Sequence, residues 1–196
     1  MTLIAKNHFA LNRTDYTKGL ISGRYKNQWQ SSLDIRPIAL PTEDKLSELQ
    51  GKMDEKWHWS AQERYNDGSL TVKLTHPETA LFELMDDSAS SINPIGYTFV
   101  TAPDTSVKER FWGAANHPVI EVENLGLFPT HEGGGRGKAY FEMLFERYFK
   151  DYETVYWSQH ETHSPTLKRF YQEKMGMTLL GIDNVPDFRP RELKYG

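Results

Sequence analysis

A glycine-rich run at 133–137 lies between two strongly patterned segments, and it constrains the fold more than any other feature of the chain. Before the run, apolar and acidic residues share an alternating pattern over 119–127, which predicts a β-strand. One face of this predicted strand carries Val119, Glu121, Glu123, Leu125 and Leu127. After the run, apolar residues from Phe141 to Tyr148 follow the i, i+3, i+4, i+7 spacing of a helix face.

The glycine run itself predicts an anion site. Glycines permit positive φ and close approach of the backbone, so several N–H groups can converge on one anion where the helix begins. Two cations add to this field at the start of the helix. The predicted pyrophosphate cradle comprises Gly133, Gly134, Gly135, Arg136, Gly137 and Lys138.

Other interpretations of the glycine run compete with the cradle. A Walker A loop needs G-x-x-x-x-G-K-[ST], but the glycine spacing is one residue short and Ala139 replaces the hydroxyl that binds magnesium. A dinucleotide fingerprint needs G-x-G-x-x-G after the first strand of a βαβ unit, whereas this run comes late and lacks that spacing. A flexible glycine turn without a ligand is the third alternative.

The rest of the chain predicts an α/β domain, because strands and helices alternate in its second half. Helices are expected to begin near Pro41, near Ser60 and at Ser164, and 70–74 fits either a strand or a helix end. Further strands are expected at 33–39, 80–85, 95–101, 154–158 and 177–182. The first thirty residues have no clear period. We therefore expect an irregular N-terminal extension at 1–30 and a single domain at 31–196.

Composition excludes several classes of function. The chain has 27 acidic and 23 basic residues, so its formal net charge of −4 argues against a general nucleic-acid binder. The lack of cysteine excludes disulfides, a cysteine nucleophile and zinc sites with thiolate ligands. No apolar run suggests a signal peptide or a membrane span, so a cytoplasmic protein is expected. A zinc motif H-E-x-x-H from His160 would need His where Ser164 stands, and no metal site is expected.

Two motifs and the order of the elements resemble the GNAT superfamily of acyl-CoA-dependent N-acyltransferases. Leu127-Phe128-Pro129 and the following 132–137 are similar to the family's strand end and its [QR]-x-x-G-x-[GA] loop, with Glu132 where the family has Gln or Arg. Downstream, 164–171 is similar to the family's N-x-x-A-x-x-x-Y helix, with Ser164 standing for Asn. The resemblance covers residues 33–182 and implies a GNAT-like mixed sheet, flanked by helices, that is partly split between 119–127 and 154–158.

The resemblance also implies an acyl donor, acetyl-CoA, lying in the split. Its pantetheine arm would bond to the backbone at Leu125, Gly126 and Leu127, and its pyrophosphate would bind at 133–138. Ser164 and Tyr171 would complete the donor site. Parallel strands that diverge leave unpaired backbone groups, and a peptide-like arm can satisfy them.

For the reaction, the resemblance implies direct attack of a primary amine on the thioester in a ternary complex. Glu123 is the preferred base and Glu121 the second candidate, and each could instead be a salt-bridged glutamate. Tyr171 would protonate the departing thiolate, unless it only packs on a helix face. The backbone N–H of Leu127 would polarise the thioester carbonyl.

The acceptor is left open among small amines, aminoglycosides, peptide N-termini and lysine side chains. No nucleic acid or membrane partner is expected, and a homodimer is a candidate assembly. The alternative function is a non-catalytic GNAT-shaped module that binds acyl-CoA or a partner protein.

Overall fold

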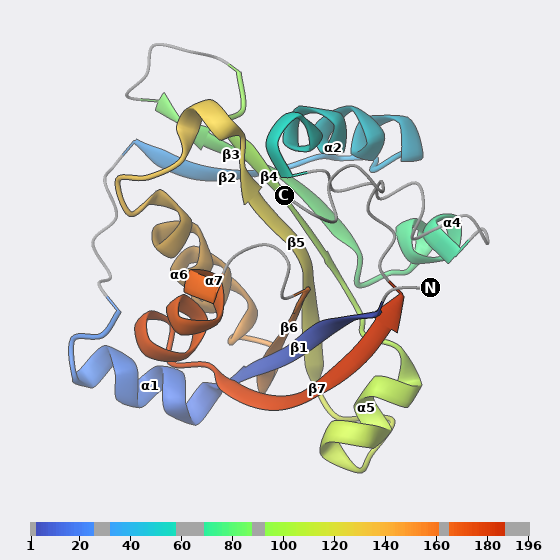
Figure 1. The fold of residues 1–196 in the computed structure, drawn as a ribbon, viewed down its shortest axis with the longest axis vertical. Coiled ribbons are helices and arrows are strands. Elements are labelled where there is room, and N and C mark those ends of the chain that lie inside the picture. Colours follow the sequence, from blue (N-terminus) through green and yellow to red (C-terminus); the bar gives the residue numbers. More distant parts are fainter. Residues whose placement is uncertain (1–2, 26–31, 58–68, 88–92, 161–164, 187–196) are drawn as a thin grey trace.

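The computed structural model describes residues 3–25, 32–57, 69–87, 93–160 and 165–186 (Figure 1). The strands are β1 (Leu3–Asn12), β2 (Leu33–Pro37), β3 (Ala80–Asp86), β4 (Gly96–Thr101), β5 (Val119–Leu127), β6 (Thr154–His160) and β7 (Thr178–Pro186). The α-helices are α1 (Arg13–Ile21), α2 (Glu43–Trp57), α4 (Ser69–Thr75), α5 (Thr105–Trp112), α6 (Arg136–Tyr148) and α7 (Pro165–Arg169). A 3₁₀ turn, η2 (Pro129–His131), precedes α6, and a π-helical turn, η4 (Phe170–Lys174), continues α7.

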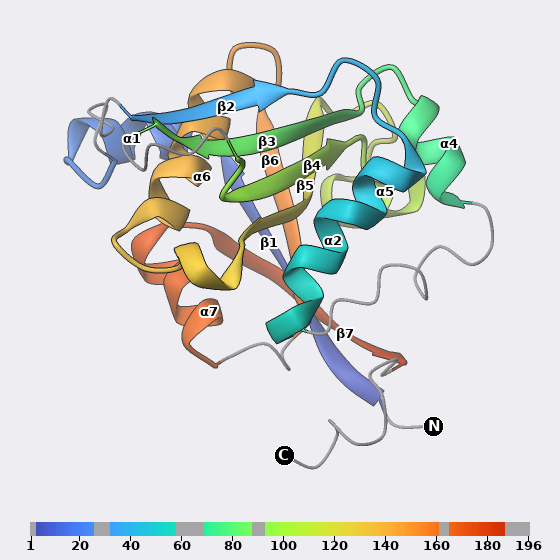
Figure 2. The same ribbon diagram turned by 90° about the horizontal axis from the view of Figure 1, so that it is seen from above.

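The strands form one mixed sheet in the order β2-β3-β4-β5-β6-β1-β7. Among the described strands, β5 and β6 pair in parallel, and the other neighbouring pairs are antiparallel. Helices α1, α6 and α7 cover one face of the sheet, and α2, α4 and α5 cover the other (Figure 2). This mixed α/β architecture agrees with the fold class expected from the sequence.

The predicted N-terminal extension is wrong, because the first strand lies inside the sheet. β1 pairs with β6 from Lys6↔His160 to Asn12↔Thr154 and with β7 on its other side. Both faces of this strand are covered, so its buried positions include Asn7 and His8 as well as Phe9. A strand with polar residues at buried positions shows no apolar period, which is why the sequence pattern missed it.

Two further helices were not resolved by the sequence pattern. Residues 70–74, which fitted either a strand or a helix end, belong to helix α4. Helix α5 was not predicted, and none of its residues is buried, so its sequence carries little apolar signal. The helix expected near Ser60 lies outside the described residues.

The sheet splits between β5 and β6. Their ladder runs only from Val119↔Thr154 to Val122↔Trp157, and beyond that point β5 stays paired with β4 while β6 stays paired with β1. The second half of β5 therefore borders a gap in the sheet. This is the split that the resemblance implies.

Candidate active site

A β-bulge interrupts β5 at Glu123. In the β4–β5 ladder Phe99 pairs with Asn124 and Val100 pairs with Val122, so Glu123 is the extra residue. An extra residue in one strand shifts the alternation of side chains beyond it. The unbroken alternation predicted over 119–127 is therefore wrong.

The packing follows the shifted alternation. Before the bulge, Ile120 and Val122 belong to the core cluster that includes residues of α6. After the bulge, Leu125 and Leu127 join the same cluster, although they have the opposite parity. The bulge thus keeps an apolar face toward α6 while Glu121 lies on the other face.

The backbone of β5 turns polar groups toward the gap. The N–H of Phe128 donates to the carbonyl of Ile95 (2.8 Å), which fixes which residues of β5 bond to β4. In an antiparallel ladder hydrogen-bonded and non-hydrogen-bonded pairs alternate, so Leu127 and Leu125 form non-hydrogen-bonded pairs with β4. Their backbone N–H and C=O groups point away from β4, toward the gap.

Glu121 is buried on the α4 side of the sheet. Its residue exposure is 8%, and burial raises its pKa to about 7, with a further contribution from the charge of Glu123. The nearby Lys73 opposes this shift without cancelling it. Glu121 therefore changes its protonation state in the neutral range, as a general base of an enzyme requires.

Glu123 is held by a lysine that the sequence analysis did not single out. Lys73 Nζ from α4 lies 3.1 Å from both carboxylate oxygens of Glu123. Burial lowers the pKa of Lys73, but Glu123 and Glu121 more than offset it, so Lys73 stays protonated. This ion pair depends on the docking of α4 against β5, and no local sequence pattern predicts it.

The glycine turn has the geometry of a backbone cradle. Gly133, Gly134 and Gly135 have φ of +92°, +63° and +78°, a region that favours glycine. Gly135 is the N-cap of α6 and has no side chain to bond the first N–H groups of the helix. A Cβ placed on Gly133, Gly135 or Gly137 would meet no atom within 4 Å, so a ligand has room to approach the backbone there.

Both cations of the predicted cradle contact acidic residues. Arg136 Nε lies 3.0 Å from Asp86 Oδ2, a buried carboxylate at the end of β3. Lys138 Nζ lies 2.6 Å from Glu142 Oε1 and donates to the carbonyl of Arg24 (2.8 Å). These contacts fix the start of α6 on the fold, and any anion at the cradle depends mainly on the backbone N–H groups.

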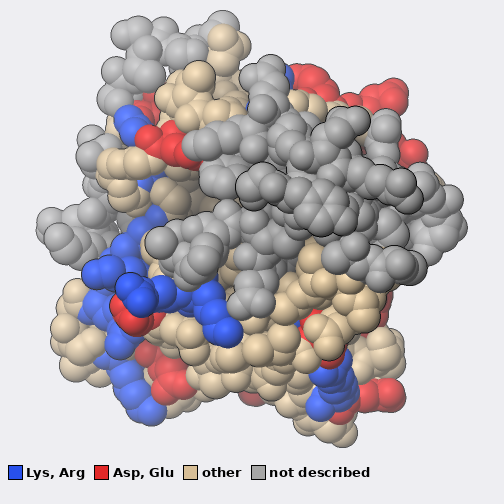
Figure 3. Space-filling view, viewed as in Figure 1, with Lys and Arg blue, Asp and Glu red and all other residues tan. Residues whose placement is uncertain are grey.

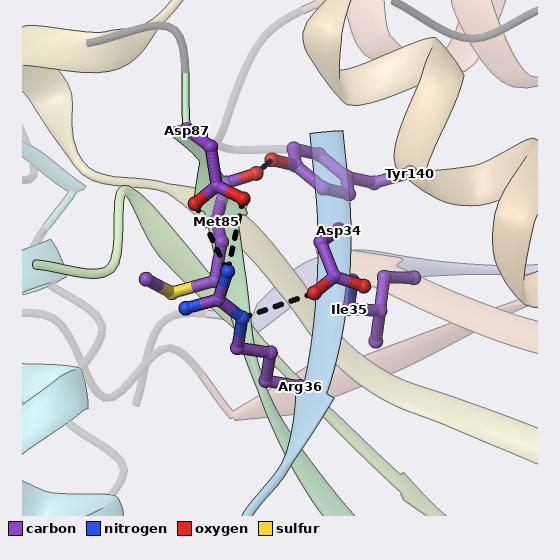
Figure 4. A network of polar contacts seen from close by, with 6 residues as sticks. All are labelled: Asp34, Ile35, Arg36, Met85, Asp87 and Tyr140. Atoms are coloured by element: carbon purple, nitrogen blue, oxygen red, sulfur yellow. Dashed lines mark hydrogen bonds and ion pairs between the residues drawn. The ribbon is translucent and has the colours of Figure 1, made fainter. Parts of the chain in front are cut away.

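The corner beside the cradle is further tied by the network in Figure 4. The hydroxyl of Tyr140 in α6 donates to the carbonyl of Met85 in β3 (2.5 Å). Arg36 of β2 bridges Asp34 (3.0 Å) and both carboxylate oxygens of Asp87 (2.9 and 3.0 Å). Strands β2 and β3 are thus fastened to each other and to the helix that carries the cradle.

Tyr171 lies in η4 within an aromatic cluster. Its ring centroid is 5.3 Å from that of Phe9 and 5.7 Å from those of Phe141 and Trp157. Burial raises its pKa well above the ordinary value, so the phenol is protonated at neutral pH. Because Trp157 is the last residue of β6 that pairs with β5, Tyr171 lies beside the beginning of the gap. Ser164, the other predicted donor-site residue on this side, lies outside the described residues.

A metal site and a membrane-spanning helix are both absent from the part of the chain that the structure describes. No group of three or more His, Asp or Glu side chains there is arranged to hold a metal ion. No described helix combines the length and apolar character needed to cross a membrane.

Comparison with known proteins gives no match by sequence to a family model or to a curated protein. Solved structures do match. A tandem GNAT protein from the clavulanic acid biosynthesis pathway superimposes with a TM-score of 0.55 at 12% identity, over 95% of this chain and 55% of that one. A conserved protein of unknown function from Staphylococcus epidermidis gives 0.55 at 11% identity, over 93% and 60%.

A third structure is matched over nearly its whole length. It is an aminoglycoside acetyltransferase from an uncultured soil metagenomic sample, in complex with sisomicin, with a TM-score of 0.53 at 13% identity, over 83% of this chain and 98% of that one. This chain spans less than two thirds of the first two neighbours. At these identities the likeness concerns the fold, and together with the split sheet and the glycine turn it shows that this chain has the fold of the GNAT acetyltransferases.

Proposed function

We propose that this chain is an N-acetyltransferase that transfers an acetyl group from acetyl-CoA to a primary amine by direct attack. The observation that carries the proposal is the gap between β5 and β6 leading to the glycine turn at the start of α6. A peptide-like pantetheine arm can bond to the backbone of Leu125 and Leu127 that faces the gap. The pyrophosphate then lies at the N–H groups of 133–138.

Charge supports an anionic donor on this side of the molecule. Lys and Arg side chains gather over α1 and α7 on the face shown in Figure 3. Both helices lie on the same side of the sheet as α6 (Figure 2). This field favours the phosphates of acetyl-CoA even though the formal net charge of the whole chain is −4.

We assign the role of base to Glu121 in preference to Glu123. A pKa of about 7 lets Glu121 take a proton from an acceptor ammonium, directly or through a water molecule, and release it afterwards. Glu123 is bound by Lys73, so in this proposal its charge is committed to an ion pair. Tyr171, a protonated phenol beside the gap, donates the proton to the departing thiolate.

The proposal is tested by following thiol release from acetyl-CoA with a panel of primary amines. Because the chain has no cysteine, a thiol reagent reports only the CoA that is set free. Polyamines, peptides and aminoglycosides belong on the panel, the last because one structural neighbour is an aminoglycoside acetyltransferase. Turnover with one acceptor class, reduced by about 10²-fold in Glu121→Gln and only a few-fold in Glu123→Gln, is the expected result.

Other outcomes separate the alternatives. Tight CoA binding without turnover on any amine would support the non-catalytic module. A loss of turnover in Glu123→Gln with full activity in Glu121→Gln would move the base to Glu123. Absence of CoA binding in the folded protein would overturn the proposal.

A further inference from the structure

A chain of hydrogen bonds leads from the gap in the sheet toward its outer strand, on the face that α5 covers. His8 of β1 lies at its centre, with Nδ1 2.5 Å from the hydroxyl of Tyr156 of β6 and Nε2 3.0 Å from Asp183 Oδ2 of β7. Ser158 pairs with His8 in the β1–β6 ladder and is the second hydrogen-bond partner of the Tyr156 hydroxyl. These four side chains, called the relay below, have no role in the mechanism given above.

The hydrogen bonds of the relay have a fixed direction. Arg110 of α5 binds both carboxylate oxygens of Asp183 (2.6 and 2.7 Å), which keeps that group ionised. An ionised carboxylate only accepts, so His8 carries its proton on Nε2 and presents a lone pair at Nδ1. The Tyr156 hydroxyl donates to this lone pair, and its oxygen is left to accept from Ser158. A proton that enters at Ser158 can therefore pass along the relay to His8.

The middle of the relay is closed, while its first residue is accessible. Tyr156 and His8 have exposures of 1% and 3%. Phe111 packs on the His8 ring with a centroid distance of 5.1 Å, and Trp112 packs on the Tyr156 ring at 5.8 Å. Ser158 is only half-buried. A substrate or a water molecule in the gap thus reaches the relay at Ser158.

Ser158 lies on the same face of the sheet as Glu121. Tyr156 is the ladder partner of Glu121, and Ser158 follows two residues later on the same side of β6. The ladder between β5 and β6 ends at Trp157, so Ser158 borders the gap. An amine that attacks a thioester from this face therefore lies between Glu121 on one strand and Ser158 on the other.

Acetylation of a primary ammonium removes two protons from nitrogen, because the ion has three N–H bonds and the amide has one. In the proposed function Glu121 takes the first proton, before attack. We propose that the relay takes the second: after attack the nitrogen gives a proton to Ser158 Oγ, Ser158 passes its own proton to Tyr156, and Tyr156 passes its own to Nδ1 of His8. The C–N bond has then formed, and the C–S bond breaks as the carbonyl re-forms and Tyr171 protonates the sulfur.

His8 is suited to hold this proton for a short time. Burial, and then the charge of Lys6 on β1, lower its pKa below the ordinary value, so the ring is neutral at pH 7 and free to accept. Of the other charged groups around the ring, Asp183 on β7 favours the imidazolium and Arg110 on α5 opposes it. Attack places positive charge on the nitrogen and acidifies its N–H bonds, so a weak base suffices. When the products leave, water in the gap receives the proton by the reverse path.

The first experiment measures the relay in the ligand-free protein, without turnover. The exchange of the Tyr156 hydroxyl hydrogen with water is followed by NMR, and its signal is assigned by its loss in Tyr156→Phe. Ser158→Val fills the place of the hydroxyl with carbon, so exchange then waits for local opening and should slow by about tenfold or more. Ser158→Thr has the same shape as Ser158→Val but keeps a hydroxyl, and it is the matched control. Equal exchange rates in the two variants would overturn the proposal.

The second experiment uses an amine that the protein acetylates. Ser158→Val, Tyr156→Phe and His8→Leu each break the relay at one point and should lower turnover by about 10²-fold. Combining two of them should cost no more than the larger single loss, because a broken relay cannot be broken again. Ser158→Thr should restore turnover to within a few-fold of wild type. Losses that multiply, or full turnover in Ser158→Val, would contradict the relay.

The inference rests on the proposed function, but the two fail in different ways. If no amine is acetylated, the proposed function fails, and the hydroxyl exchange still decides whether the relay carries protons. If amines are acetylated while exchange does not depend on the Ser158 hydroxyl, the relay fails and the function stands. Should His8→Leu not fold, the variants at Ser158 and Tyr156 carry both experiments.

Discussion

Glu121 and Glu123 lie two residues apart on β5, yet their surroundings give them different chemistry. Burial raises the pKa of Glu121 to about 7, while Glu123 forms an ion pair with Lys73. The difference arises from the docking of α4, which brings Lys73 against the carboxylate of Glu123, on the strand face opposite the apolar residues that face α6.

The buried carboxyl of Glu121 predicts a dependence of stability on pH. Its folded-state pKa is raised above the unfolded value of 4.5, so the folded protein holds this proton more tightly and loses stability as pH rises from about 4.5 through 7. Glu121→Gln removes that loss. Its free energy of unfolding, relative to that of wild type, should therefore rise by about 3 kcal/mol between pH 5 and pH 8. Urea unfolding at both pH values measures this.

The matched change on the neighbouring carboxylate should act in the opposite direction. Glu123→Gln removes the ion pair that Glu123 forms with the largely buried Lys73 and should destabilise the protein by about 1–3 kcal/mol. Equal unfolding free energies for the two variants at pH 8 would contradict the different environments described for the two glutamates.

Tyr171→Phe tests the proposed acid while it keeps the aromatic packing. The ring contacts with Phe9 and Trp157 remain, so unfolding should change little and CoA affinity should stay within a few-fold. Loss of the hydroxyl should lower turnover by about 10²-fold, the scale of general-acid assistance. Turnover equal to that of wild type would leave Tyr171 with a packing role alone.

At the scale of elements, the glycine turn and α6 can be tested at Gly137. This residue has an ordinary helical φ and open space around its missing Cβ, so Gly137→Ala and Gly137→Val should both fold. The bulkier valine should block the approach of a pyrophosphate and weaken CoA binding by about tenfold or more, equivalent to losing a contact of 1.5–3 kcal/mol. Calorimetric titration of CoA into both variants, with alanine as the smaller control, measures this.

Strand β1 lies in the segment that the sequence pattern assigns to an irregular extension. It pairs with β6 on one edge and β7 on the other, and it supplies Phe9 and Leu11 to the core. Deleting residues 1–12 should therefore abolish cooperative unfolding, whereas removal of an irregular extension would leave it intact. Circular dichroism with urea titration distinguishes the two outcomes.

At the scale of the whole molecule, the sequence predicted those features that a local residue pattern determines. The strand at 119–127, the glycine turn and the helix over 136–148 follow from periodicity and from glycine chemistry. The α/β class followed from the alternation of elements, and the mixed, split sheet followed from the resemblance to the GNAT superfamily. Lys73 beside Glu123 and the place of β1 in the sheet depend on contacts between distant segments, which no local pattern records.

The same reasoning explains the incomplete prediction of the site. The resemblance to the GNAT superfamily identified Glu121, Glu123 and Tyr171 as candidates and preferred Glu123 as the base, whereas the environments of the two glutamates favour Glu121. The distinction rests on burial and on an ion pair, both of which arise only after α4 docks on the sheet.

The position of β1 also determines when this protein can fold during its synthesis on the ribosome. The strand is synthesised well before β6 and β7, which must flank it, and at about 5–20 residues per second it waits on the order of 10 s for them. During that interval both of its edges are open to pairing with other chains. Nascent chains arrested before β6 should stay sensitive to protease, and those that also expose β7 outside the exit tunnel should become resistant. Translation rate and chaperone supply are therefore expected to influence the yield of this protein.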